Sequence, residues 1–177
     1  ERATARDLDE LVRFIATRQR HREMGYVFTE ETLLERFQRW PGFEPSSFFV
    51  VRDDAGRIVG TAAPWDTSPF KRTRVLGYHG TMTLVQRTFN AWVTVGGFPK
   101  LPRPGDCFRF VFLTHLEIDG DDPDVLQDLL RGIYAALRDQ RLHFMSAMIP
   151  VGSPLEAGFK GFRLNRTPMT ILSVSLP

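Results

Sequence analysis

The chain has 177 residues, 42% of them hydrophobic and 25% charged, a balance typical of a single soluble globular domain. Its net charge of +2 is too small to indicate nucleic-acid binding, although the pI is about 9.0. No apolar run approaches the roughly 20 residues of a membrane span, so neither a membrane nor a nucleic acid is an expected partner.

The single cysteine, Cys107, can form no disulfide within the chain and favours a cytoplasmic location. No signal peptide is visible in the sequence. Because the sequence begins at Glu1, without Met and almost directly with a helix, we expect it to be a piece of a longer protein.

Two amphipathic helices are predicted near the N-terminus. Thr4–Asp7 has the pattern of a capping box, and apolar residues follow it at helical spacing: Leu8, Leu11, Val12 and Ile15. Thr29–Thr32 starts a second helix, which ends at Pro41-Gly42. The apolar stripe of this second helix consists of Leu33, Leu34, Phe37 and Trp40.

A β-hairpin is predicted next. Ser47–Val51 forms its first strand, Asp53–Gly56 its tight turn, and Arg57–Ala63 its returning strand.

The segment from Pro64 to Asp106 has a less regular pattern. Val75–Val85 is predicted to be extended, and Arg87–Val95 to be helical. The glycines and prolines of Gly96–Gly105 indicate a loop.

The C-terminal half alternates between strands and helices. A long apolar strand at Cys107–Ile118 is followed by a helix that starts at Pro123. The buried stripe of this helix consists of Leu126, Leu129, Leu130, Ile133 and Leu137. Three further elements are predicted: a strand at Leu142–Ile149, a short helix or turn at Pro154–Phe159, and a closing strand at Met169–Leu176. The strand–helix–strand unit implies one parallel pairing and the hairpins imply antiparallel pairings. We therefore predict an α/β (α+β) domain with a mixed, mainly antiparallel central sheet and helices on both faces.

This order of elements resembles the GNAT superfamily, the acyl-CoA-dependent N-acetyltransferases. The pieces that carry the resemblance are the hairpin Phe48–Ala63, the strand Phe110–Ile118, the helix Asp124–Gln140 and the stretch Leu142–Phe162 with its terminal "GF". The segments "WDTSPFKRTRVLGY" and "GGFPKLPRPG" are similar to segments of uncharacterised tandem-GNAT bacterial proteins.

The resemblance implies a single GNAT-like domain over residues 1–177, with a long inserted segment at about 64–106. It implies transfer of an acetyl group from acetyl-CoA to an amine, which is either a small molecule or part of a protein. It also implies a second GNAT domain in the same longer chain as a candidate partner.

The turn after the long apolar strand departs from the family pattern. GNAT enzymes carry Gln/Arg-x-x-Gly-x-Gly/Ala there, and its backbone amides bind the CoA diphosphate. In this sequence the turn is Asp119–Asp124, with four carboxylates, and Gly132 lies too far into the helix to substitute. Two unit charges about 4 Å apart interact by roughly 4 kcal/mol at an effective dielectric near 20, so these carboxylates oppose a diphosphate. We expect one of them to cap the helix instead, which removes the standard phosphate site.

A second departure precedes the terminal "GF". Many GNAT enzymes place a tyrosine four residues before this glycine, where it protonates the CoA thiolate. Here that position is Ala157, and the nearest aromatic residue, Phe159, has no proton to donate.

Amide formation from a thioester needs a base for the amine and N–H donors for the carbonyl oxygen. His115 and Glu117 are two residues apart on a predicted strand, so they share one face, where the carboxylate would orient the histidine and raise its pKa. They are the predicted catalytic residues; the alternative is a polar pair at a strand end. The backbone at Leu116 and Ile118 is the predicted cofactor contact.

Two pairs of residues are predicted to line the acceptor cleft: Trp65 with Asp66, and Tyr78 with His79. The alternative for both pairs is an ordinary, partly buried loop. Nearby basic residues are candidates for a CoA phosphate contact, or else solvated surface: Lys71, Arg72 and Arg74.

The remaining reactive residues indicate no other chemistry. Cys107 has no base beside it in the sequence, and the four histidines have no metal-ligand spacing. His21 is expected to be exposed, and the direction of His143 is left open.

Two hypotheses for function therefore stay open. One is an active acetyltransferase. The other is a degenerate GNAT-like domain without CoA binding, which acts as a structural or regulatory half of a tandem protein.

Overall fold

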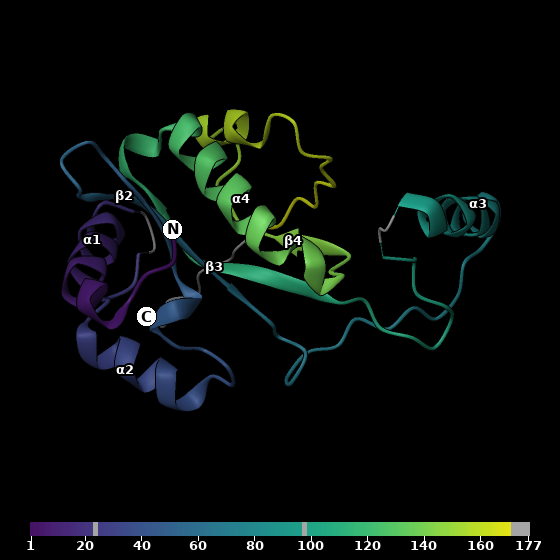
Figure 1. Cartoon of the computed structure of the whole chain (residues 1–177), viewed down its shortest axis with the longest axis horizontal. Coiled ribbons are helices and arrows are strands. Elements are labelled where there is room, and N and C mark those ends of the chain that lie inside the picture. The colour runs from purple at the N-terminus through teal and green to yellow at the C-terminus, as the bar shows by residue number, and fades with distance from the viewer. Residues whose placement is uncertain (23–24, 97–98, 171–177) are drawn as a thin grey trace, which may run out of the picture.

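The structure is a computed structural model that describes residues 1–22, 25–96 and 99–170. At its centre lies one sheet with strand order β1-β2-β3-β4 (Figure 1). The strands are β1 (Phe49–Arg52), β2 (Ile58–Trp65), β3 (Phe110–Ile118) and β4 (Phe144–Ser146). The pairs β1–β2 and β2–β3 are antiparallel, and β4 runs parallel to β3, so the predicted mixed, mainly antiparallel sheet is confirmed.

Helices cover both faces of this sheet, as predicted. α1 (Leu8–Arg20) and α2 (Glu30–Arg39) lie on one face, and α4 (Pro123–Leu137) lies on the other (Figure 1). Both predicted N-terminal caps are present, because the side chains of Thr4 and Thr29 accept backbone N–H groups of the next turn. The short 3-10 helices are η1 (Ala5–Asp7), η2 (Pro45–Ser47), η3 (Asp119–Asp121), η4 (Arg138–Gln140) and η5 (Pro154–Phe159).

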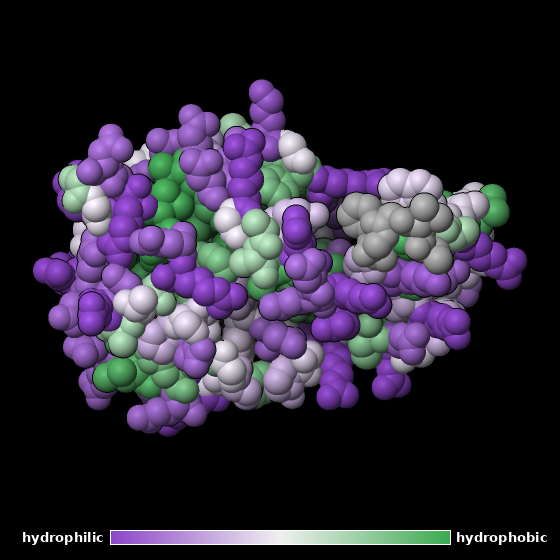
Figure 2. All heavy atoms as spheres, in the orientation of Figure 1, coloured by the Kyte–Doolittle hydropathy of each residue, from purple (hydrophilic) through white to green (hydrophobic). Residues whose placement is uncertain are grey.

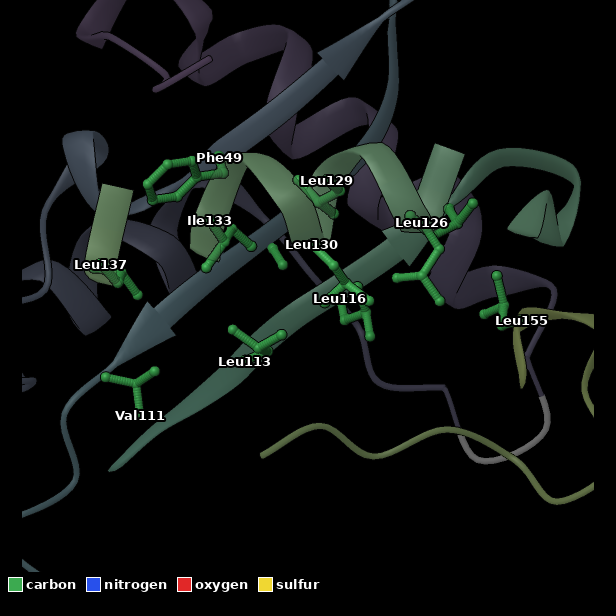
Figure 3. Packing of buried hydrophobic residues seen from close by; sticks show 12 residues of the cluster. Phe49, Val111, Leu113, Leu116, Leu126, Leu129, Leu130, Ile133, Leu137 and Leu155 are labelled. Atoms are coloured by element: carbon green, nitrogen blue, oxygen red, sulfur yellow. The ribbon is translucent and has the colours of Figure 1, made fainter. Parts of the chain in front are cut away.

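The core beneath α4 forms as the sequence pattern predicts. All five residues of the predicted stripe are buried, and Figure 3 shows them pointing at side chains of β1 and β3. Each large aliphatic side chain buried in this way stabilises the fold by about 1.5–3 kcal/mol. The position of α4 on the sheet therefore follows directly from its periodicity.

The inserted segment differs from the prediction. α3 spans Thr81–Gly96, so the expectation of an extended segment as far as Val85 is wrong. The β-branched residues there favour a strand by propensity, but a backbone turn at Gly80 (φ 58°) starts a helix instead. Figure 1 shows α3 set apart from the sheet, and its Leu84 and Trp92 are 66% and 65% exposed.

Two C-terminal strand predictions change as well. The strand predicted at Leu142–Ile149 is limited to β4, because β4 pairs with β3 only along Phe110–Phe112. The closing strand predicted at Met169–Leu176 falls mostly outside the described residues, and no strand includes Met169.

The surface is largely polar. Figure 2 shows mostly hydrophilic residues on one face of the molecule, with smaller hydrophobic patches between them. Within the described ranges, every helix is too short or too polar to cross a lipid bilayer.

Candidate functional site

The centre of β3 contains a β-bulge at His115. Thr61 of β2 pairs with Glu117, whereas Ala63, two residues on, pairs with Thr114, so β3 carries one extra residue. His115 has a φ of 52°, in the left-handed region that residues other than glycine rarely adopt. The side-chain alternation of β3 therefore shifts by one residue at this point.

The bulge decides which side chains of β3 face which helices. Leu113, before the bulge, and Leu116, after it, both lie in the core beneath α4. His115 packs against residues of the α1–α2 face, and Glu117 is held by Gln19 of α1 and by Arg22 just beyond that helix. His115 and Glu117 therefore share one face, as the sequence predicts.

His115 is enclosed by aromatic rings and is 6% exposed. Its ring stacks on Phe43 with centroids 5.5 Å apart, and it also lies 5.3 Å from the ring of Phe48. Nε2 contacts Nη1 of Arg36, whereas Nδ1 is buried and has no hydrogen-bond partner among the described residues.

The charge state of His115 differs from the prediction. Burial, reinforced by the positive charge of Arg36, lowers the pKa of His115 from 6.5 to about 3. The expectation that Glu117 raises this pKa is wrong, because the charged group next to the imidazole is Arg36. No hydrogen bond or ion pair within the described residues joins His115 to Glu117.

The side chain of Glu117 lies on the same face of β3 as His115, and the residue is 1% exposed. The side-chain amide of Gln19 donates to Oε1, and Nη2 of Arg22 lies 3.1 Å from Oε2 as an ion pair, although without hydrogen-bond geometry. Gln19 in turn accepts a hydrogen bond of 3.2 Å from the backbone N–H of Tyr26. Burial raises the pKa of Glu117, and Arg22 and Gln19 offset only part of this effect. A raised pKa makes the carboxylate a stronger base at neutral pH.

Of the predicted acceptor-cleft residues, only Trp65 joins this cluster. Its ring stacks on Trp40 with centroids 4.2 Å apart, and Trp40 lies 5.9 Å from the ring of His115. Nε1 of Trp65 donates to the carbonyl of Pro41 at 3.2 Å. Asp66, the next residue, is exposed and accepts a hydrogen bond from the nearby backbone N–H of Ser68.

Tyr78 and His79 lie elsewhere, in the inserted segment that carries α3. The hydroxyl of Tyr78 donates to the carbonyl of Pro102 at 2.8 Å, and burial raises the pKa of this phenol. His79 is exposed. The basic residues of the same segment are exposed as well: Lys71, Arg72 and Arg74.

The predicted cofactor contacts, Leu116 and Ile118, lie in the half of β3 beyond its pairing with β4. Their side chains are buried beneath α4, so only their backbone could meet a ligand. β3 pairs with β4 only along Phe110–Phe112, so the backbone at Leu116 and Ile118 lies beyond that pairing.

As predicted, a side chain of the acidic turn caps the helix that follows it. Oδ1 of Asp122 accepts from the backbone N–H of Asp124 at 2.8 Å and caps α4. Arg18 forms ion pairs with Asp121 at 3.0 Å and with Asp119 at 3.7 Å. At the same helix start, η5 packs so closely that a Cβ on Gly158 would lie 2.6 Å from the carbonyl oxygen of Pro123. The residues at this corner therefore do not fit a diphosphate bound in the standard GNAT manner.

The described surface includes two cavities near the predicted residues. One of about 240 Å³ opens beside His115 and is lined by Thr32, Glu35, Arg36, Arg39 and Trp40. The other, of about 430 Å³, lies at the base of the inserted segment and is lined by Asn90, Lys100, Leu101, Pro102, Arg103, Asp106, Cys107 and His143. None of the predicted catalytic or binding residues lines either cavity, but two lining residues of the smaller one, Arg36 and Trp40, contact His115, so the smaller cavity is adjacent to the site. In the described part of the chain, no group of three His, Cys, Asp or Glu side chains could hold a metal ion.

Three residues of the site were not identified from the sequence: Gln19, Arg22 and Arg36. Gln19 continues the spacing of Leu11 and Ile15, so a polar residue on an apolar stripe was a usable signal. Arg36 interrupts the stripe of α2 in the same way. Nothing local indicates that Arg22 turns back toward β3.

No protein-family model matches the sequence, and no curated protein matches it either. Solved structures do match, along nearly the whole chain. A single-residue variant of TTHA1254 from Thermus thermophilus is 15% identical with a TM-score of 0.54, and the match covers 100% of this chain and 96% of that one. Glucosamine-6-phosphate N-acetyltransferase from Arabidopsis thaliana is 10% identical with a TM-score of 0.55, over 97% and 95% of the two chains. An acetyltransferase from Trypanosoma brucei is 13% identical with a TM-score of 0.51, over 98% of this chain and 97% of that one.

Identities this low show a shared fold alone, so any chemistry has to be inferred from the residues of the site. Because the matches extend over nearly all of each chain, the shared fold includes the mixed sheet and the helices on both of its faces. This chain therefore has the fold of the GNAT superfamily, the acyl-CoA-dependent N-acetyltransferases.

Proposed function

We propose that this chain is an acetyltransferase in which Glu117 is the general base for an amine acceptor and acetyl-CoA is the acyl donor. The observation that carries the proposal is a buried carboxyl group of raised pKa on the central strand, two residues beyond the β3 bulge. An amine bound there loses a proton to Glu117, so that its nitrogen lone pair can attack the thioester carbonyl. The C–N bond forms, the C–S bond breaks, and the nitrogen releases its second proton to water as the amide forms, while the thiolate takes a proton from water, because position 157 carries no tyrosine.

Two features of the site define what this reaction requires. The guanidinium of Arg22 lies where an ammonium group would approach Glu117, so Arg22 must move aside when the acceptor binds. The capped turn at Asp122 also means that the donor's diphosphate binds away from the standard position.

The unpaired Cys107 agrees with a reducing compartment such as the cytoplasm.

The acetyltransferase proposal is tested by thiol release and by ligand stabilisation. Free CoA is measured while the chain is mixed with acetyl-CoA and small primary amines or lysine-containing peptides. We expect Glu117→Gln to slow release by roughly 10²–10⁴-fold, and Asp139→Asn, at an exposed carboxylate away from both cavities, to leave it unchanged. Acetyl-CoA at 100 times its dissociation constant would raise the free energy of unfolding by about 2.7 kcal/mol, or several degrees in Tm.

The second candidate function is a degenerate domain that no longer binds CoA. It is favoured by the Asp122 cap, by the pairing of Arg18 with Asp119 and Asp121, and by Ala157 at the tyrosine position. Its partner would be a second GNAT domain in the same longer chain. Absence of both thermal stabilisation and thiol release would establish this candidate in place of the first.

A further inference from the structure

Arg36 is a cation without a carboxylate partner among the described residues. Its guanidinium carbon lies 5.0 Å from the ring centroid of Tyr26, 5.3 Å from that of Trp40 and 5.5 Å from that of Phe28. In the described ranges, no Asp or Glu oxygen forms an ion pair with it. Aromatic rings displace water from a cation and compensate its charge only in part, so a guanidinium held in this way favours an anion.

The hydrogen bonds of Arg36 leave one particular edge available. Nη1 donates to the hydroxyl of Tyr26 at 3.3 Å and contacts Nε2 of His115. The imidazole is neutral at physiological pH, so Nε2 accepts a hydrogen bond and adds no second positive charge. Nε and Nη2 have no hydrogen-bond partner within the described residues, and neither is buried from solvent. These two N–H groups form the side of the guanidinium that holds a carboxylate through two parallel hydrogen bonds.

Arg36 lines the cavity of about 240 Å³ on the surface of α2. Arg39, which also lines the cavity, forms an ion pair with Glu35 at 3.0 Å. Arg39 therefore already has a carboxylate partner, whereas Arg36 has none among the described residues. The volume is below the range of sites for drug-sized ligands, so it fits a small charged group.

We propose that Arg36 binds the carboxylate of the acceptor, so that the substrate class is an amine that also carries a carboxylate. The assignment of this anion to the acceptor rests on the proposed acetyltransferase function, whereas the anion site itself does not. His115, which contacts Arg36, and Glu117 lie on one face of β3, two residues apart in the sequence. The acceptor is then an amino acid whose carboxylate meets Arg36 and whose amine reaches toward Glu117 once Arg22 has moved aside. His115 is a positioning residue, because it contacts Arg36 and no substrate atom.

The test uses the full chain and measures binding directly. The Nε–Hε NMR signals of the arginines are followed during titration with 4-aminobutyrate, with n-butylamine and with inorganic phosphate. We expect 4-aminobutyrate to shift the Arg36 signal saturably and n-butylamine to leave it in place. Arg36→Lys keeps the charge but loses the paired donors, so it should weaken 4-aminobutyrate binding about tenfold or more. Arg131→Lys, at an exposed residue on α4, is the matched control and should bind as the wild type does.

The outcomes separate this inference from the proposed function. Saturable binding of 4-aminobutyrate through Arg36 without any thiol release would support the anion site and count against the acetyltransferase. Equal shifts with n-butylamine, or unchanged affinity in Arg36→Lys, would overturn the carboxylate site even in an active enzyme. Saturable phosphate binding without 4-aminobutyrate binding would overturn the choice of carboxylate. In an active enzyme, Arg36→Lys should raise KM for 4-aminobutyrate and leave KM for n-butylamine unchanged.

Discussion

The buried histidine of the β3 bulge gives a prediction with a calculable magnitude. The pKa of His115 is about 3 in the folded chain and 6.5 when unperturbed, because burial and Arg36 disfavour the imidazolium. Between these two values the unfolded chain binds a proton that the folded chain does not, so stability falls as the pH is lowered. The contribution is fully present above about pH 6.5 and is lost progressively toward pH 3.

The expected size follows from the linkage relation. Each pH unit over which only the unfolded state is protonated changes the free energy of unfolding by about 1.4 kcal/mol. From about pH 7 to about pH 5, His115 alone should therefore remove about 2 kcal/mol of stability. His115→Asn removes the titrating group, and asparagine tolerates the left-handed backbone of the bulge better than most residues.

The assay is urea unfolding of both proteins at the two pH values, followed by tryptophan fluorescence. The wild type should lose about 2 kcal/mol more than His115→Asn on acidification, because the other titrating groups are common to both proteins and cancel in the difference. Comparing this difference between the two pH values also cancels any constant packing change in the variant. An equal loss in the two proteins would mean that His115 titrates normally, and the enclosed arrangement described for it would be wrong.

Three further predictions concern the capped turn, the close packing of η5 and the buried base. Asp122→Ala should lower the free energy of unfolding by about 1 kcal/mol in urea titrations, since it removes the cap of α4, and an unchanged midpoint would contradict the cap. Gly158→Ala should destabilise by about 1–3 kcal/mol, because the new Cβ would lie 2.6 Å from the carbonyl oxygen of Pro123. The control Gly132→Ala meets nothing within 4 Å and should instead raise Tm, through about 0.5–1 kcal/mol of helix propensity. Because burial raises the pKa of Glu117, its ionisation opposes folding. Relative to Glu117→Gln, the wild type should therefore lose stability as the pH rises from 4.5 through the folded pKa of Glu117, since the contribution of His115 is common to both proteins and cancels in pH-resolved urea titrations.

Much of the fold could be predicted because its signals are local. The apolar stripe of α4 repeats every three or four residues, and the cap at Asp122 accepts from a backbone N–H only two residues later. Neighbouring positions in the sequence therefore contain the whole pattern. The hairpin of β1 and β2 follows from one turn between alternating strands. The helical start of α3 was missed because its β-branched residues favour strands, whereas a turn at Gly80 decided the conformation.

The site depends instead on contacts between distant parts of the chain. The sequence alone determined that His115 and Glu117 share a face, because alternation along a strand is a property of the backbone. Only the tertiary structure decided their partners: Arg36 lies 79 residues from His115 in sequence, and Gln19 lies 98 residues from Glu117. The bulge is also set by the register with β2, which no spacing within β3 encodes. Burial against α1 and α2 lowers the pKa of His115 and raises that of Glu117, so the packing of the two layers decided both shifts.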